Sequence, residues 1–156
     1  MARQPSWMGG SINPHSRARS VRYTQVPAPS SKKQGESSFS RDLKKNLHRI
    51  FSHSKWWKNH GTEYSEKGLS DLMGIINGRF YAIEVKIGNA WFTALQINFL
   101  RSVKQAGGMA LGILKKDNTI NIIPLEAMGH KGNHHRELWF EINYPDGLSI
   151  LEYWER

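Results

Sequence analysis

Residues 67–86 read KGLSDLMGIINGRFYAIEVK, and they contain two short apolar runs, 72–76 and 79–85, separated only by Asn77 and Gly78. An Asn-Gly pair between apolar runs is the strongest short-range signal of a β-hairpin, because both central residues of a type I′ turn need a positive φ. The stretch therefore predicts two antiparallel strands joined by a two-residue turn.

The register of this hairpin brings charged side chains together. Opposed residues lie equally far from the turn, so Asp71 is predicted to face Glu84, with Cβ atoms about 4.5 to 5.5 Å apart. Side chains alternate along a strand, so Lys86 points to the same face as Glu84. Two carboxylates held so close repel each other and need a cation.

Carboxylate oxygens suit a hard cation such as Mg²⁺, which is usually held by one or two carboxylates together with substrate phosphate. The alternative is that Asp71 is an edge-strand acid and that Glu84 and Lys86 form a solvated ion pair. That alternative is weakened by the apolar residues of the same face, because charges at the rim of an apolar stripe are costly. These residues are Met73, Ile75, Phe80 and Ala82.

The rest of the chain predicts helices and strands around the hairpin. A helix is expected over 37–51, where four apolar residues recur on one face, and a second over 93–106, capped by Thr93 and stopped by Gly107 and Gly108. Strands are expected over 109–114 and 119–123, and a second hairpin over 138–154 around Pro145. The apolar stripes are Phe39, Leu43, Leu47 and Ile50 in the first helix and Leu95, Phe99, Val103 and Ala106 in the second.

These elements predict an α/β domain with a mixed β-sheet flanked by helices. Residues 36–125 would form the core, and residues 126–156 a C-terminal extension that packs on the core as a β-hairpin or forms a dimer interface. Residues 1–35 contain six basic and no acidic residues, together with many Ser, Pro and Gly, so we expect a disordered basic arm. The arm would either fasten to nucleic acid or remain a solvated tail.

Composition narrows the function. The formal charge of +9 and a pI near 9.9 indicate a polyanionic partner. The chain has no cysteine, no apolar run long enough to cross a bilayer and no apolar signal segment, so we expect a soluble intracellular protein without a membrane partner. Without thiolates, any metal would be held by oxygen or imidazole.

The order of these motifs resembles the PD-(D/E)XK nuclease core. Asp71 follows Lys67-Gly68-Leu69-Ser70, with serine where the motif name has proline, and the second strand carries Ile83-Glu84-Val85-Lys86. The continuation, with Gln96 on the following helix and Gly107-Gly108 after it, is most similar to the VRR-NUC branch and next to archaeal-type Holliday-junction resolvases. The resemblance covers roughly residues 36–114 and implies a restriction-endonuclease-like fold.

The resemblance also implies roles for single residues. Asp71 and Glu84 would be metal ligands, the Val85 carbonyl would complete the coordination, and Lys86 would be the catalytic lysine. Gln96 matches a polar position that reaches the active site. An acid on the first helix is expected as a further ligand and catalytic residue, for which Glu36 fits best if the helix extends that far. Asp42 is the fallback, and a first-turn acid that favours the helix dipole is the alternative reading of Glu36.

The expected function is a metal-dependent DNA endonuclease that hydrolyses phosphodiester bonds with Mg²⁺, or with Mn²⁺ in its place. Branched DNA such as a Holliday junction would be the substrate, in DNA recombination or repair. Because junction cleavage needs two nicks, a homodimer follows. The alternative is a non-catalytic basic nucleic-acid-binding protein on a nuclease fold.

Two further groups of residues suggest contacts with nucleic acid. The loop from His130 to His135 is rich in imidazoles, but it lacks the acidic and hydrophobic framing of a zinc site, so we expect a polar loop that contacts phosphate. The pairs Trp56-Trp57 and Trp91-Phe92 either stack on splayed bases or pad the core or a dimer interface.

Overall fold

The computed structural model describes residues 31–61, 67–129 and 135–154. The chain divides into the units Met1–Ser31 and Lys32–Arg156, and the fold described here is that of the second unit. Residues 1–30 of the predicted basic arm lie outside the described residues. Within the described ranges, no helix is long and apolar enough to span a membrane.

A six-stranded mixed sheet is the centre of the fold, with the strand order β1-β2-β3-β4-β5-β6. Only β3 and β4 run parallel, and all other neighbouring strands run antiparallel. The strands are β1 (Ser54–Lys58), β2 (Leu72–Ile76), β3 (Arg79–Ile87), β4 (Met109–Lys116), β5 (Thr119–Pro124) and β6 (Phe140–Ile142). The predicted α/β class with a mixed sheet is confirmed, as are the strands expected over 109–114 and 119–123.

The β2–β3 hairpin has the predicted register. Leu72 pairs with Ile83, and Ile76 pairs with Arg79 directly beside the turn. Asn77 and Gly78 have φ values of 49° and 78°, the left-handed conformation that a type I′ turn requires. Asp71, one residue before β2, is thereby brought to the level of Glu84 in β3.

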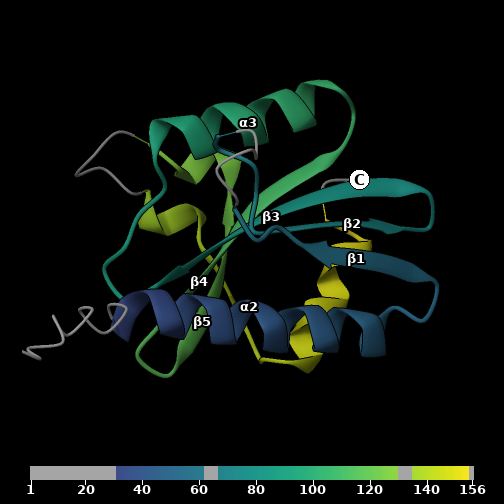
Figure 1. The fold of residues 1–156 in the computed structure, drawn as a ribbon, viewed down its shortest axis with the longest axis horizontal. Coiled ribbons are helices and arrows are strands. Elements are labelled where there is room, and N and C mark those ends of the chain that lie inside the picture. Colours follow the sequence, from purple (N-terminus) through teal and green to yellow (C-terminus); the bar gives the residue numbers. More distant parts are fainter. Residues whose placement is uncertain (1–30, 62–66, 130–134, 155–156) are drawn as a thin grey trace, which may run out of the picture. The chain divides into compact units, whose positions relative to one another are not determined.

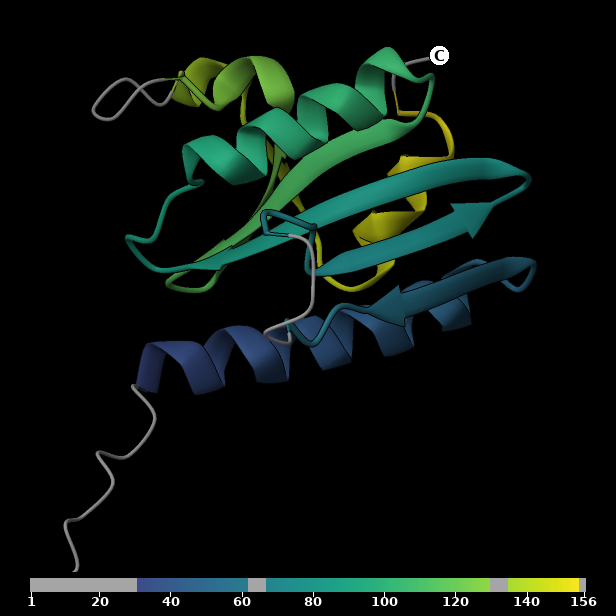
Figure 2. The same ribbon diagram turned by 45° about the horizontal axis from the view of Figure 1, so that its top comes forward.

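One helix covers each face of the sheet (Figures 1 and 2). Helix α2 (Ser31–Ile50) packs Phe39, Leu43 and Leu47 against the odd-numbered residues of β3. Helix α3 (Ala94–Gln105) packs on the opposite face, where Ala82 shares a cluster with Leu100 and Val103. The alternation along β3 thus sends Glu84 and Lys86 to the α3 side.

Both helices depart from the prediction in detail. Helix α2 begins at Ser31 rather than at residue 37, so residues 31–35 belong to it and not to the arm. In α3 the predicted capping by Thr93 is confirmed, and of the predicted stripe Val103 is buried and Phe99 packs against the core. Leu95 and Ala106 are exposed instead, and Leu100 is buried in their place. The helix is rotated so that the polar side chain of Gln96 faces the sheet beside Glu84.

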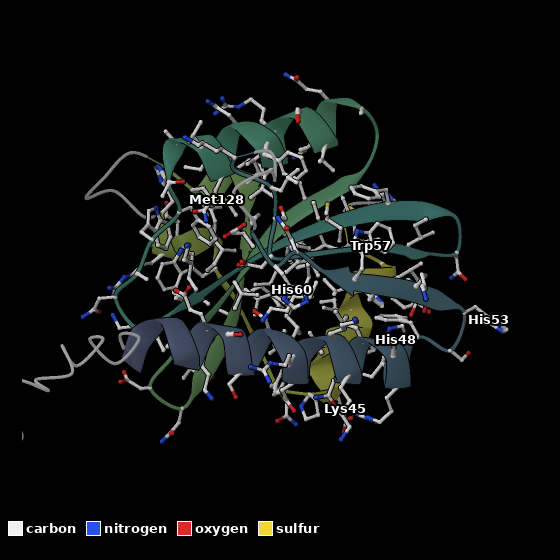
Figure 3. All side chains as sticks on the ribbon, in the orientation of Figure 1. Lys45, His48, His53, Trp57, His60 and Met128 are labelled. Atoms are coloured by element: carbon white, nitrogen blue, oxygen red, sulfur yellow. The ribbon has the colours of Figure 1, made fainter. Side chains whose placement is uncertain are left out.

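Strand β1 was not predicted, because its sequence Ser54–Lys58 is polar around two tryptophans. Trp56 is 2% exposed, and its ring lies against Gly74 on β2, where a Cβ would come within 2.2 Å of Trp56 Cε3. Trp57 points to the other face and is 37% exposed (Figure 3). Of the roles proposed for this pair, packing in the core is the one that Trp56 has.

The predicted C-terminal hairpin is wrong. Two short 3-10 helices, η1 (Leu125–Ala127) and η2 (Arg136–Leu138), precede β6. Strand β6 pairs with β5, and the chain then forms a third 3-10 helix, η3 (Asp146–Glu152), instead of a returning strand. Ile142, Leu148 and Leu151 are buried in the same cluster as α2. The extension therefore packs on the core, as one of the two alternatives proposed.

The close contact of Trp56 with Gly74 can be tested by substitution. We expect Gly74→Ala to destabilise the fold by about 1 to 3 kcal/mol, because the new methyl overlaps the Trp56 ring. Gly35→Ala is the matched control: its Cβ would meet only Ile87 Cδ1 at 3.5 Å, and alanine favours the helix, so stability rises by up to about 1 kcal/mol. Urea denaturation measures the stability of both variants, and equal effects of the two changes would contradict the close contact between Trp56 and Gly74.

Candidate active site

Asp71 and Glu84 form an acid pair at the end of the hairpin. Asp71 Oδ2 accepts a hydrogen bond of 2.8 Å from the backbone N–H of Val85. Its own carbonyl accepts a hydrogen bond from Asn59, which continues the β1–β2 pairing past the strand ends. Glu84 is 1% exposed, in the middle of β3. Hydrogen bonds from the backbone of Asn59 and Val85 therefore fix Asp71, and Glu84 is fixed by its position in β3.

Lys86 and Gln96 surround the Glu84 carboxylate. Glu84 Oε1 accepts a hydrogen bond of 2.5 Å from Gln96 Nε2 and lies 3.8 Å from Lys86 Nζ. Glu84 Oε2 is buried and has no hydrogen-bond donor among the described residues. The structure thus brings four of the predicted site residues, Asp71, Glu84, Lys86 and Gln96, to one place.

The pKa of Glu84 is raised from 4.5 to about 9. Burial is the largest cause, because it disfavours the charged form, and the negative charge of Asp71 adds to it. When one of the two acids is protonated, a side-chain hydrogen bond with Asp71 also raises the pKa, whereas Lys86 and a backbone hydrogen bond at Asp71 lower it. Without a cation, Glu84 therefore holds a proton at neutral pH.

These features fit a divalent cation. A buried carboxylate oxygen without a donor, beside a second carboxylate, is an oxygen donor set of the kind that Mg²⁺ binds. A cation there would offset the repulsion that the proton on Glu84 otherwise relieves. Asp71 and Glu84 are the residues that would hold it.

Gln96 has a second role at the start of α3. Its Oε1 accepts a hydrogen bond of 2.9 Å from the backbone N–H of Thr93, and the Thr93 hydroxyl accepts one from the backbone N–H of Gln96. This reciprocal arrangement is a capping box, which stabilises the first turn of a helix. The cap orients the amide so that its nitrogen points at Glu84.

Lys58 is a cation near Asp71 that the sequence did not single out. Its Nζ donates hydrogen bonds to the carbonyl and the hydroxyl of Ser37 on α2, at 3.1 and 2.7 Å. Its pKa is lowered by burial and by the positive charge of Arg41, and the charge of Asp71 acts in the opposite direction. Lys58 therefore places a cation near the acid pair from the α2 side. Lys58 ends strand β1, so a sequence analysis that recognised this strand would have pointed to it.

Two further predicted ligands are Glu36 and the carbonyl of Val85, which lies between Glu84 and Lys86 on β3. Glu36 is on α2, as its role required, and is partly exposed. Among the described residues, no three acidic or histidine side chains are grouped to hold a metal ion. The fallback, Asp42, accepts a hydrogen bond from the Tyr144 hydroxyl on the C-terminal segment. Glu36 and the Val85 carbonyl therefore remain predictions as ligands.

The imidazole-rich loop is described only at its end. His130 to His134 lie outside the described residues, and His135 Nδ1 lies 3.1 Å from the Glu137 carboxylate. In the second aromatic pair, Phe92 is buried and Trp91 packs beside Trp139 in the α3-side core. A contact of this loop with phosphate remains a prediction.

The raised pKa of Glu84 predicts how stability depends on pH without metal. The folded state binds the Glu84 proton more tightly than the unfolded chain, so the stabilisation is complete below about pH 4.5 and is lost as the pH rises through about 9. We expect the metal-free protein to lose at least about 4 °C in Tm between neutral pH and about pH 9. In Glu84→Gln this loss should shrink, because the amide does not titrate, and parallel melting curves for both proteins would contradict the assignment.

Comparisons with known proteins show the fold. No family model and no curated protein matches the chain. Among solved structures, it is similar to Hjc of Archaeoglobus fulgidus, a Holliday junction resolvase from an archaeal hyperthermophile, with a TM-score of 0.52 and 22% sequence identity. The match covers 75% of this chain and 98% of that chain. The restriction-endonuclease-like core is thereby confirmed, and the VRR-NUC branch remains a prediction.

Proposed function

We propose that this chain is a metal-dependent DNA endonuclease that hydrolyses phosphodiester bonds. The observation that carries the proposal is the buried Glu84 carboxylate, held between Asp71, Lys86 and Gln96, with one oxygen that has no donor in the described part of the chain. A strongly shifted pKa beside a specific charge partner is typical of functional sites. The likeness of the fold to a resolvase supports the same reading.

Each residue of the site has a separate task in this proposal. Asp71 and Glu84 would hold the cation, with Glu36 and the Val85 carbonyl as further candidate ligands. The chemistry that bound Mg²⁺, or Mn²⁺ in its place, would supply is Lewis-acid activation of the phosphodiester and of a water molecule. Lys86 stabilises the negative charge that develops on the phosphate oxygens in the transition state. Gln96 fixes the orientation of the Glu84 carboxylate.

Branched DNA is the substrate that we propose. One similar solved structure is a Holliday junction resolvase, and the net charge of +9 favours contacts with the phosphate backbone. Two nicks across a junction need two active sites, so the proposal includes a homodimer. Exposed apolar side chains suited to an interface are Leu138, Phe140 and Tyr153 on the C-terminal segment and Trp57 and Ile75 on β1 and β2.

Cleavage of a labelled four-way junction, beside matched linear duplex and single strand, tests the proposal in Mg²⁺ or EDTA. We expect junction-selective, metal-dependent cutting, and a loss of about 100-fold or more in Asp71→Asn and Lys86→Ala. Lys45→Ala, which removes an exposed charge on α2, is the control and should cut normally. If the wild type binds all three DNAs and cuts none in Mg²⁺ or Mn²⁺, a non-catalytic nucleic-acid-binding protein replaces this proposal.

A second pair of variants separates the two roles of Gln96. Gln96→Ala and Thr93→Ala both remove the capping box, and we expect each to cost about 1 kcal/mol of stability. Only Gln96→Ala also removes the hydrogen bond to Glu84, so it alone should lower cleavage, by about 10-fold or more. Equal losses of cleavage in both variants would show that the cap, and not the contact with Glu84, matters.

A further inference from the structure

A small cavity of about 140 Å³ lies beside the proposed site, between the loop that follows β3 and the segment around η2. Its lining includes Leu114 on β4, which pairs with Lys86 across the parallel β3–β4 ladder. Paired residues of adjacent strands point to the same face of a sheet. The cavity therefore begins one strand away from Lys86, on the α3 side.

Two cations line this cavity. Lys116 follows Leu114 by two residues and so points to the same face, and Arg136 of η2 approaches from the other side. Neither has a carboxylate partner in the part of the chain that the structure describes. The nearby Glu137 carboxylate is paired with His135. Two cations around one cavity, without an acid between them, favour an anionic ligand.

An aromatic pair holds Arg136 in place. The guanidinium carbon of Arg136 lies 5.4 Å from the centre of the Trp139 ring, and Trp91 stacks on Trp139 at 5.7 Å with an angle of 22° between the rings. With these two groups already on the indole, the ring is not an open platform for a base. A guanidinium fixed on an aromatic ring keeps its N–H groups available for two hydrogen bonds to a phosphate.

We propose that Lys116 and Arg136 bind one backbone phosphate of the DNA strand, next to the phosphate that is cleaved at Lys86. This inference rests on the proposed function, because Lys86 marks the cleaved phosphate. The subsite fixes the strand in register with the acid pair and carries no sequence information. Trp139 and Trp91 are positioning residues for Arg136.

The test measures DNA binding without metal, in EDTA, over a range of salt concentrations. Each phosphate that a protein neutralises contributes about 0.9 to the slope of log K against log salt for duplex DNA. We expect Lys116→Ala combined with Arg136→Ala to lower the magnitude of the slope by about 1, and each single change to lower it by no more than that. Lys45→Ala, on the outward side of α2 (Figure 3), is the control for each single change, because it also removes one charge, and it should leave the slope unchanged.

The outcomes separate this subsite from the proposed function. A double variant that binds with the same slope as Lys45→Ala overturns the subsite, even if the wild type cleaves DNA normally. A slope lowered by about 1 in a protein that never cleaves supports the subsite and removes only the nuclease proposal. A wild type that binds no DNA overturns both. Circular dichroism melting of each variant confirms that the changes leave the fold intact.

Discussion

The structure depends on the burial of the Glu84 carboxylate beside Asp71. Burying an acid among apolar side chains is costly, and a second acid nearby makes it costlier. The surrounding elements each offset part of this cost: the hairpin gives Asp71 a backbone N–H, β3 supplies Lys86, and α3 supplies the Gln96 amide. When both acids are ionised, Glu84 Oε2 has no donor among the described residues, so a proton or a cation is needed to offset the rest of the cost.

Much of the site could be predicted because it follows from local rules. Asn77 and Gly78 determine the turn, the turn determines the register, and alternation places Glu84 and Lys86 on one face. The structure has this register and this face. Gln96 came from the family resemblance, and its contact with Glu84 agrees with that expectation.

The parts that the sequence did not reveal depend on distant contacts. Strand β1 has no apolar period of its own, and it becomes a strand because Trp56 fits the space left by Gly74. The C-terminal segment has the turn residues of a hairpin, but its apolar side chains instead fill the cluster beneath α2. Helix α3 buries Leu100 and Val103 and directs Gln96 to Glu84, and this orientation leaves Leu95 exposed. Lys58 was missed together with β1.

The double use of Gln96 restricts how this position can evolve. Its oxygen caps the helix and its nitrogen serves the buried acid, so the side chain must offer an acceptor and a donor at the same reach. Glutamate would keep the cap but would add a third negative charge, and asparagine would be one methylene too short for a capping box. The stability of the helix and the contact with the acid therefore depend on the same side chain, and neither of these two close relatives of glutamine can replace it in both roles.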